Sequence, residues 1–283
     1  MLVSAKQVLA DARARHYAVP AFDCVADVWV RAILETAGAC RAPVFLMCLE
    51  TDVAGNGWLY FSGLVKAIAD HHPIPIVLHL DHTTSLDSIR KAVDLGFTSV
   101  MIDGSSLPFD ENVRLTRAAV EIARPQGVSI EAELGHVGGM DLEARSHAEN
   151  VLTEADEVAR FVDRTDVDSL AVSIGTSHGV YQSLPTLNIA RLKELDQASR
   201  VPLVLHGGSG TPTDQLQEAI RNGIAKINVY ADCRIAMRRG LERSAAGQRR
   251  LDPLPHEVFG PIHEEISAAV KEKIDQLLAA RRA

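Results

Sequence analysis

Residues 77–106 read VLHLDHTTSLDSIRKAVDLGFTSVMIDGSS and contain the parts of one complete unit of strand, helix and strand. The apolar, β-branched run at the start predicts a buried strand. Ser85 is then placed to cap a helix that Gly96 ends. The apolar residues between these two positions share one helix face: Leu86, Ile89 and Val93. A second apolar run, 99–102, follows, so the stretch predicts two parallel strands connected by a helix.

The same alternation runs through all 283 residues. Apolar runs that predict strands occur eight times, at 18–22, 44–48, 76–80, 99–102, 128–132, 169–174, 203–205 and 224–229. Eight such units in about 230 residues fit a closed (β/α)8 TIM barrel better than an open doubly wound sheet. No linker rich in Pro, Gly or Ser divides the chain. We therefore expect a single α/β barrel domain over 1–283, with extra helices in 1–15 and 256–283.

Helix boundaries can be read from local signals elsewhere in the chain as well. Thr211 followed by Pro212 predicts a helix start, and Gly223 predicts the end of the same helix. Thr153 likewise precedes apolar residues at helical spacing. These signals place helices between the predicted strands, as a barrel requires.

Composition and charge restrict the function. The net charge of −8 and the pI near 5.8 argue against a nucleic-acid surface, which requires concentrated Lys and Arg. The apolar runs fall short of the roughly 20 residues that cross a bilayer, and the N-terminal segment lacks an apolar signal core, so neither membrane insertion nor export is expected. The cysteines lie far apart without a CxxC pair, which indicates reduced thiols in a cytoplasmic protein.

Three histidines follow three predicted strands. His82 lies in HLDHTTS, His178 in SIGTSHG and His206 in LHGGSG. Because chemistry in such barrels sits at the carboxyl ends of the strands, these side chains are expected to converge. Neutral imidazole is a common Zn²⁺ ligand, and three protein ligands leave a coordination position open. The sequence therefore predicts a site for Zn²⁺ or another divalent transition metal.

Carboxylates surround the same mouth. Asp81 adjoins His82 and could either move a proton at the substrate or orient a histidine through a hydrogen bond. Neighbouring strand side chains point to opposite faces, so Asp81 and His82 would diverge unless the strand ends there. Asp103 in MIDGS and Glu133 in EAELG are each a candidate alternative metal ligand, supporting partner or loop hydrogen-bonding group.

Two segments near the seventh and eighth predicted strand ends suggest phosphate binding. GGSG begins at Gly207, and NVYAD begins at Asn228. Many barrels bind phosphate there through backbone N–H groups and a helix N-terminus, and glycine lets an anion approach the main chain.

At this point the chain resembles the class II, metal-dependent fructose- and tagatose-bisphosphate aldolases. The matching strings run in family order over nearly the whole chain: VLHLDHTTSLDSIRKAVDLGFTSVMIDGSSLPFDENV, EAELGHVGG, DSLAVSIGTSHGVY, VPLVLHGGSG and GIAKINV. The resemblance implies cleavage of a phosphorylated ketose to dihydroxyacetone phosphate and an aldehyde. In that chemistry a cation stabilises the enediolate left when C3–C4 breaks, and no Schiff-base lysine is required.

The resemblance also implies roles for individual residues. His82, His178 and His206 would be the zinc ligands, and Asp81 would take the proton of the C4 hydroxyl. Asp103 and Glu133 match carboxylates of alternative or transient metal positions. The phosphate would be held by Gly179, Gly207, Gly208, Ser209, Asn228, Val229, Tyr230 and Ala231. Relatives assemble as dimers or tetramers, so a homodimer or homotetramer is expected, and a monovalent cation is a further expected cofactor.

Several positions depart from the family pattern. The usual Asn-Val-(Ala or Gly)-Thr segment continues here with Tyr230 and Ala231, so a phosphate-binding hydroxyl is missing. Asp23 stands where the family has Asn in AFNVN, and Leu49 stands where a Ser is common. In the loop after the fifth strand Met140 and Asp141 follow the GG pair, and Asp141 is the candidate loop acid or base in place of the usual Glu. These departures predict an altered substrate with unchanged bond chemistry.

Two other function classes remain open from the sequence. A metal-dependent hydrolase could use the same open cation to activate water, although many barrel hydrolases carry an HxH pair at the first strand and this chain has Ala21-Phe22-Asp23 there. A non-catalytic sugar-phosphate-binding relative would explain Tyr230 and the altered loop. Retention of Asp81 beside three histidines favours the aldolase.

Overall fold

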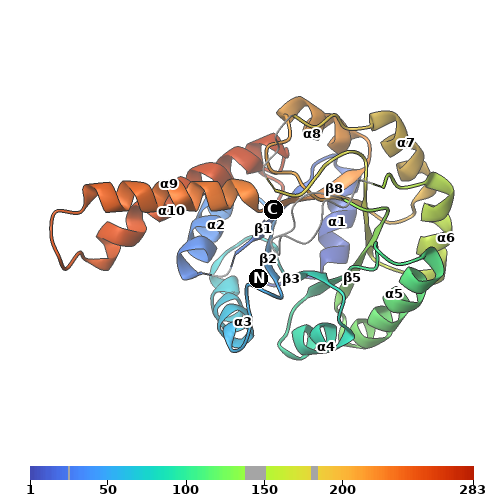
Figure 1. Ribbon diagram of the computed structural model, residues 1–283, viewed down its shortest axis with the longest axis horizontal. Coiled ribbons are helices and arrows are strands. Elements are labelled where there is room, and N and C mark those ends of the chain that lie inside the picture. Colours follow the sequence, from blue (N-terminus) through green and yellow to red (C-terminus); the bar gives the residue numbers. More distant parts are fainter. Residues whose placement is uncertain (25, 138–150, 180–183) are drawn as a thin grey trace.

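The computed structural model describes residues 1–24, 26–137, 151–179 and 184–283. Eight strands close into a barrel in sequence order, and each neighbouring pair is parallel (Figure 1). The strands are β1 Val19–Asp23, β2 Val44–Leu49, β3 Ile76–Thr83, β4 Ser99–Ile102, β5 Ser129–Leu134, β6 Ser169–Val172, β7 Leu203–Leu205 and β8 Ile224–Val229. The predicted (β/α)8 TIM barrel is confirmed.

Helices connect the strands and flank the barrel. They are α1 Ala5–Ala14, α2 Asp27–Cys40, α3 Gly57–Ile68, α4 Leu86–Asp94, α5 Phe109–Ala123, α6 Ala155–Thr165, α7 Ile189–Ala198, α8 Thr213–Arg221, α9 Ala231–Gly247 and α10 Pro255–Gln276. Two short 3-10 turns, Ala69–His71 and Arg124–Gln126, follow α3 and α5. Within the described ranges, no helix combines the length and the apolar character of a membrane span.

Most boundaries follow the sequence signals. The Ser85 hydroxyl accepts a hydrogen bond from the Ser88 N–H at 3.2 Å and so caps α4, and Gly96 after this helix has a φ of 85° that favours glycine. Several predicted boundaries were slightly wrong. β3 continues past the predicted 80 to Thr83, β5 continues past 132 to Leu134, and β6 ends at Val172, before 174. α8 begins after Pro212 instead of Thr211, because Pro212 keeps an extended ψ of 139°.

The N-terminal segment covers one end of the barrel. Leu2 forms a parallel bridge with Ile76 at the start of β3, and the Ser4 hydroxyl lies 2.6 Å from that of Ser129 at the start of β5. Both partners begin strands, so α1 lies at the amino-terminal end of the barrel. The opposite end, where the strands finish, is left for the functional site.

Helices α9 and α10 form an arm. They run side by side and project away from the barrel, while the base of α10 packs on α2 (Figure 1). Gly240 in α9 lies against the α10 backbone, because a Cβ built there would be 2.4 Å from Ile262 Cα. The close approach of the two helices therefore depends on the absence of a side chain at Gly240.

Gly240→Ala should loosen the arm. The added methyl cannot fit without moving α10, which we expect to lower the free energy of unfolding by about 1–3 kcal/mol. Gly63→Ala in α3 is the matched control, since nothing lies within 4 Å of a Cβ there and alanine favours a helix by up to about 1 kcal/mol. Urea denaturation of both variants checks this, and equal effects would show that the packing at Gly240 was misjudged.

Candidate active site

An irregularity in β3 shapes the mouth of the barrel. The pairing of β3 with β4 shifts register between Leu80 and Thr83, and His82 has a φ of 41°. Left-handed backbone is uncommon for a residue with a Cβ and occurs often at functional sites. The bulge brings the neighbouring side chains together, with Asp81 Oδ2 at 4.0 Å from His82 Nε2. Asp81 and His82 therefore share one site, although a regular strand would separate them.

Three histidines meet beside Asp81. His82 comes from β3, His178 from the loop after β6, and His206 from the residue directly after β7. The ring centroids are 5.1 Å apart for His82 and His178, 4.5 Å for His82 and His206, and 5.9 Å for His178 and His206. One nitrogen of each ring lies within 4.8 Å of the other two. The expected convergence is present, and the role of the histidines as ligands stays a prediction.

Neighbouring carboxylates identify the nitrogens that could hold a metal. His82 Nδ1 lies 3.0 Å from Asp103 Oδ2, and His206 Nε2 lies 3.1 Å from Glu131 Oε1. Because an ionised carboxylate only accepts, each of these nitrogens carries a hydrogen. The other nitrogens, His82 Nε2 and His206 Nδ1, and also His178 Nε2, are buried without a hydrogen-bond partner among the described residues. Three converging ring nitrogens without a hydrogen-bond partner fit a divalent cation, which binds them in their neutral form.

The electrostatics of the three rings differ. Burial, followed by His82 and His206, lowers the pKa of His178 to about 3, so this imidazole is neutral. Burial also acts to lower the pKa of His82, but Asp81 and Asp103 outweigh it and raise that pKa to about 10. The pKa of His206 is raised as well, because Glu131 and Glu133 outweigh burial and the charge of His82. Without a metal, His82 thus binds a proton at neutral pH.

Asp81 is an ionised carboxylate at the bottom of the mouth. Its side chain is buried, and Asn228 Nδ2 donates to both of its oxygens at 3.2 Å. Burial favours the neutral acid, but the charges of His82 and Lys226 and the contact with His79 hold the pKa of Asp81 well below its usual range. An ionised, fixed carboxylate can accept a proton from a substrate hydroxyl.

A buried ion pair supports His206 from below, which the sequence argument missed. Lys226 Nζ donates to both oxygens of Glu131 at 2.9 and 2.8 Å, and both side chains are buried. Burial alone would raise the pKa of Glu131, but Lys226 and His206 hold it at about 2. Spacing could have revealed the pair. Side chains two residues apart on a strand share a face, so Glu131 lies on the same face as Glu133, and Lys226 on the same face as Asn228. Both faces point into the barrel.

The other predicted carboxylates lie beside the histidines. Asp103 Oδ1 also accepts from the backbone N–H of Ser105 at 3.0 Å, which fixes its orientation toward His82. Glu133 Oε2 is 3.0 Å from His206 Nδ1 but is not aligned as a hydrogen bond. His82, Asp103 and Glu133 form a second group with ligand atoms within 4.8 Å of one another. This group could hold a metal ion, and the alternative metal position that the resemblance implies stays a prediction.

The proposed phosphate loops are tightly packed on one another. A Cβ at Gly207 would lie 2.4 Å from the Ser177 carbonyl oxygen, and one at Gly208 would lie 2.3 Å from Ile227 Cγ2. Packing of the loops therefore already requires glycine here, with or without an anion. Ser209 Oγ accepts from the Asp232 N–H at 3.2 Å and so fixes the N-terminus of α9.

The segment after β8 is arranged differently from the expectation. Val229 is buried in the core, and Ala231 begins α9, so these two offer only backbone groups to a ligand. Tyr230 turns toward the neighbouring β1 and β2 side of the mouth, where its hydroxyl donates to Asp52 Oδ2 at 3.0 Å and its ring meets Trp29 edge-on. The large aromatic thus contacts the β1 and β2 side.

The remaining predicted site residues lie in other loops. Gly179 has a φ of 92°, and Met140 and Asp141 lie outside the described residues.

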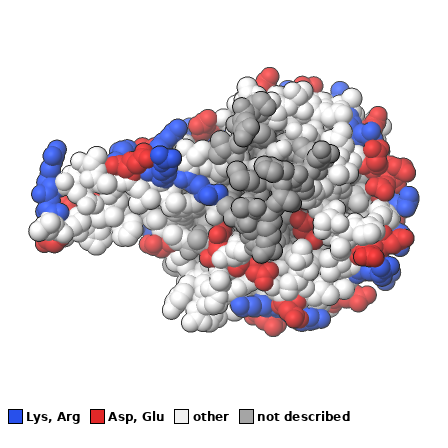
Figure 2. All heavy atoms as spheres, viewed as in Figure 1, with Lys and Arg blue, Asp and Glu red and all other residues white. Residues whose placement is uncertain are grey.

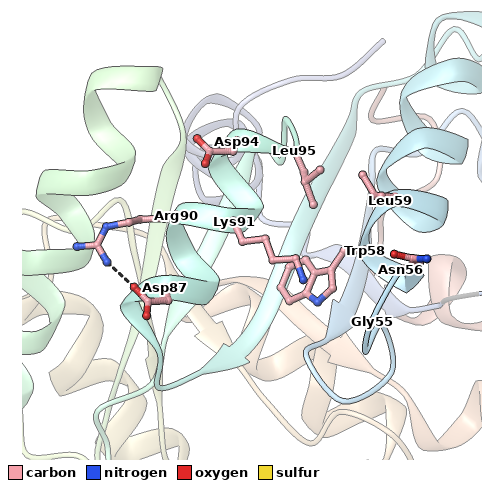
Figure 3. A pocket seen from close by; sticks show the side chains of 9 residues that line it. All are labelled: Gly55, Asn56, Trp58, Leu59, Asp87, Arg90, Lys91, Asp94 and Leu95. Atoms are coloured by element: carbon pink, nitrogen blue, oxygen red, sulfur yellow. Dashed lines mark hydrogen bonds and ion pairs between the residues drawn. The ribbon is translucent and has the colours of Figure 1, made fainter.

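A surface pocket of about 490 Å³ lies away from this chemistry, between α3 and α4 (Figure 3). Lys91 lies over the Trp58 ring at 4.6 Å, and Arg90 pairs with Asp87 at 2.7 Å. Three of its four charged groups are thus engaged with each other or with an aromatic ring, so the histidine cluster is the better candidate site. On the face in Figure 2, acidic and basic side chains are mixed around the barrel and along the arm.

Comparison with known proteins agrees with this geometry. Residues 3–282 match the family described as fructose-bisphosphate aldolase class-II. The chain belongs to this family. The crystal structure of the YdjI aldolase from Escherichia coli K12 is 32% identical over all of both chains, with a TM-score of 0.89. The fructose-bisphosphate aldolase from Campylobacter jejuni is 21% identical over 100% of this chain and 97% of that one, with a TM-score of 0.85, which shows the shared fold.

Class II aldolases are metal-dependent, and metal binding here should be linked to pH. A cation must displace the proton of His82, whose pKa is about 10, so metal affinity should rise by about tenfold or more per pH unit between pH 6.5 and 8.5. The raised pKa of His206 adds to this slope wherever its proton is displaced as well. The raised pKa of His82 also stabilises the metal-free fold below pH 6.5, and this contribution is lost as the pH rises toward 10. Chelator competition at three pH values tests the affinity, and calorimetry in two buffers tests proton release. Affinity that does not change with pH would contradict the assignment of His82.

Proposed function

We propose that this class II aldolase is zinc-dependent and reversibly cleaves a phosphorylated ketose to dihydroxyacetone phosphate and an aldehyde. The observation that carries the proposal is the convergence of three unpartnered imidazole nitrogens beside one ionised carboxylate. His82, His178 and His206 would hold the cation, and the whole chain would act as one barrel domain. The cation, when bound, supplies Lewis-acid stabilisation of the negative charge on the three-carbon half.

Asp81 would act on the C4 hydroxyl. Its oxygens accept from Asn228 and are fixed near His82, so a hydroxyl held at the mouth is within reach of a carboxylate that is already ionised. Asp81 takes the hydroxyl proton, the C3–C4 bond breaks, and C4 leaves as the aldehyde while the electron pair stays on C3. A proton delivered to C3, for which Asp141 is the candidate donor, completes dihydroxyacetone phosphate. In the reverse direction Asp81 returns the proton to the new alkoxide.

Backbone groups would hold the phosphate of the three-carbon half. Gly179, Gly207, Gly208 and Ser209 lie in the loops after β6 and β7, and α9 begins beside Ser209. A helix of this length has unpaired N–H groups and partial positive charge at its N-terminus, both of which favour an anion. Ala231 opens that helix. A monovalent cation at the phosphate is part of the same proposal.

Substitutions of Asp81 and of His206 should distinguish a loss of catalysis from a loss of metal binding. Asp81→Asn keeps the size of the side chain but cannot take the proton, so we expect full zinc occupancy and a kcat reduced by about 100-fold or more. His206→Ala should lose both zinc and turnover. Zinc content and cleavage of fructose 1,6-bisphosphate and ketose 1-phosphates would be measured together. Asp168→Asn, a buried carboxylate at the other barrel end, should retain both.

Three results would contradict the mechanism. Full zinc occupancy in His206→Ala would remove His206 from the ligand set, and cleavage that survives chelation by EDTA would exclude a metal aldolase. Borohydride trapping of a lysine adduct would point to a Schiff base instead.

We also propose that the chain forms a homodimer or homotetramer through the α9–α10 arm. Large apolar side chains are exposed on this arm: Ile235, Leu241, Leu251, Leu254 and Phe259. An apolar surface on a projecting element is typical of an interface.

The four free cysteines also fit a reducing compartment such as the cytoplasm.

Leu251→Asp combined with Phe259→Asp should weaken this association. Each change puts a charge on the surface that the partner would cover, so we expect the oligomer to dissociate at micromolar concentration. Light scattering coupled to gel filtration measures the mass. Leu107→Asp, an exposed leucine outside the arm, is the control, and equal masses for both variants would place the interface elsewhere.

A further inference from the structure

The last residue of β1 carries a carboxyl group that faces the barrel mouth. In the pairing of β1 with β8, Val19 lies level with Lys226 and Ala21 lies level with Asn228. Lys226 and Asn228 both point inward, because they contact Glu131 and Asp81. Side chains alternate along a strand, so the residue two after Ala21, Asp23, points inward as well and lies one step closer to the mouth.

Asp23 has an unused acceptor at this position. The residue is 3% exposed, and its Oδ1 is buried without a hydrogen-bond partner among the described residues. A buried carboxylate oxygen without a donor is costly, and native structures supply a donor from the protein, from water or from a ligand. Burial and the nearby charges of Asp81 and Asp52 raise the pKa of Asp23, which shows that the three carboxylates share one region.

The neighbouring wall completes a compartment. Leu49 ends β2 level with Asp81, and it contributes an apolar surface. Beyond it Asp52 is held by the Tyr230 hydroxyl at 3.0 Å. Arg234 lies 5.3 Å from the centroid of the same ring and is exposed. The compartment thus has two carboxylates and a phenol, and its guanidinium neighbour Arg234 is at the surface.

This compartment is placed for the aldehyde half of the substrate. The loops proposed to hold the phosphate follow β6, β7 and β8, whereas Asp23 ends β1, Leu49 ends β2 and Asp52 follows β2. If Asp81 on β3 takes the proton of the C4 hydroxyl, the carbons beyond C4 extend away from the phosphate loops. We propose that Asp23, together with Leu49 and the Asp52–Tyr230 pair, binds the hydroxyl groups of an uncharged polyhydroxy aldehyde and disfavours a phosphorylated one. This inference rests on the proposed aldolase function and names its substrate class, the ketose 1-phosphates that lack a second phosphate.

Charge and hydrogen bonding both support that choice. A sugar hydroxyl donates to Asp23 Oδ1 and satisfies it, whereas a phosphate dianion offers acceptors only. The phosphate would also add negative charge where the charges of Asp81 and Asp52 already raise the pKa of Asp23. Asparagine, the residue usual in this family at the position, carries no charge and supplies a donor. Substitution of Asp23 by asparagine should therefore change how well a second phosphate binds and leave bond cleavage unchanged.

The test compares two aldehydes that differ in one phosphate. Zinc-loaded enzyme condenses dihydroxyacetone phosphate with D-glyceraldehyde or with D-glyceraldehyde 3-phosphate, and kcat/KM is measured for each aldehyde. The wild type should prefer D-glyceraldehyde. Asp23→Asn should shift the ratio toward the phosphorylated aldehyde by about tenfold, and Asp52→Asn should shift it in the same direction by less. Tyr230→Phe, which releases Asp52 without removing its charge, should lower kcat/KM for both aldehydes and keep the ratio.

Glu50→Gln is the matched control. Glu50 also follows β2, but its oxygens accept from Thr83 at 2.9 Å and from Ser88 at 2.6 Å, so it does not face the compartment with a free acceptor. The aldehyde ratio should not change in this variant. A wild type that prefers D-glyceraldehyde 3-phosphate, or an Asp23→Asn ratio equal to that of Glu50→Gln, would overturn the inference.

A separate measurement distinguishes this inference from the aldolase proposal on which it rests. Exchange of the C3 proton of dihydroxyacetone phosphate with deuterium, followed by NMR, requires the metal site but no aldehyde. Exchange without the expected aldehyde preference rejects the role of Asp23 alone. Absence of exchange in the zinc-loaded wild type rejects the aldolase function and the inference with it. If Asp23→Asn does not fold, the Asp52→Asn ratio decides.

Discussion

The contact between Asp81 and His82 constrains the rest of the site. Two neighbouring residues of a strand normally point to opposite faces, and here the bulge in β3 and the positive φ of His82 turn both into the mouth. The proposed metal ligand and the proposed proton acceptor are thereby brought within 4.0 Å of each other by the backbone. The strained conformation is maintained because Asp103 holds the far side of the ring and Asn228 holds the carboxylate.

Charge balance at the barrel mouth explains why these groups tolerate burial. Buried carboxylates surround the histidines, at Asp23, Asp81, Glu131 and Glu133, whereas Lys226 is the one buried lysine that the described residues place among them. The excess negative charge raises the pKa of His82 and of His206. Protons on these rings and a divalent cation are alternative ways to neutralise the same carboxylates, and this competition links metal affinity to pH.

The two flanks of the mouth differ in what they can recognise. Loops after β6 and β7 and the start of α9 provide backbone N–H groups and close-packed glycines, which favour an anion. The flank after β1 and β2 provides acceptors, at Asp23 and Asp52. Tyr230 marks the boundary, since it follows β8 but bonds across to Asp52. A single phosphate at one end of the substrate and hydroxyl groups at the other would match this asymmetry.

The sequence by itself determined the barrel, because the alternation of apolar strands and amphipathic helices is a local pattern with a repeating period, and caps such as Ser85 act within one turn. It also identified the three histidines, since all follow predicted strand ends. Only the tertiary structure decided that Asp81 and His82 share a face, that Lys226 and Glu131 support His206, and that Tyr230 turns toward Asp52. These features depend on a register shift and on contacts between residues far apart in the chain, such as Glu131 and Lys226, and such contacts form only when the barrel closes.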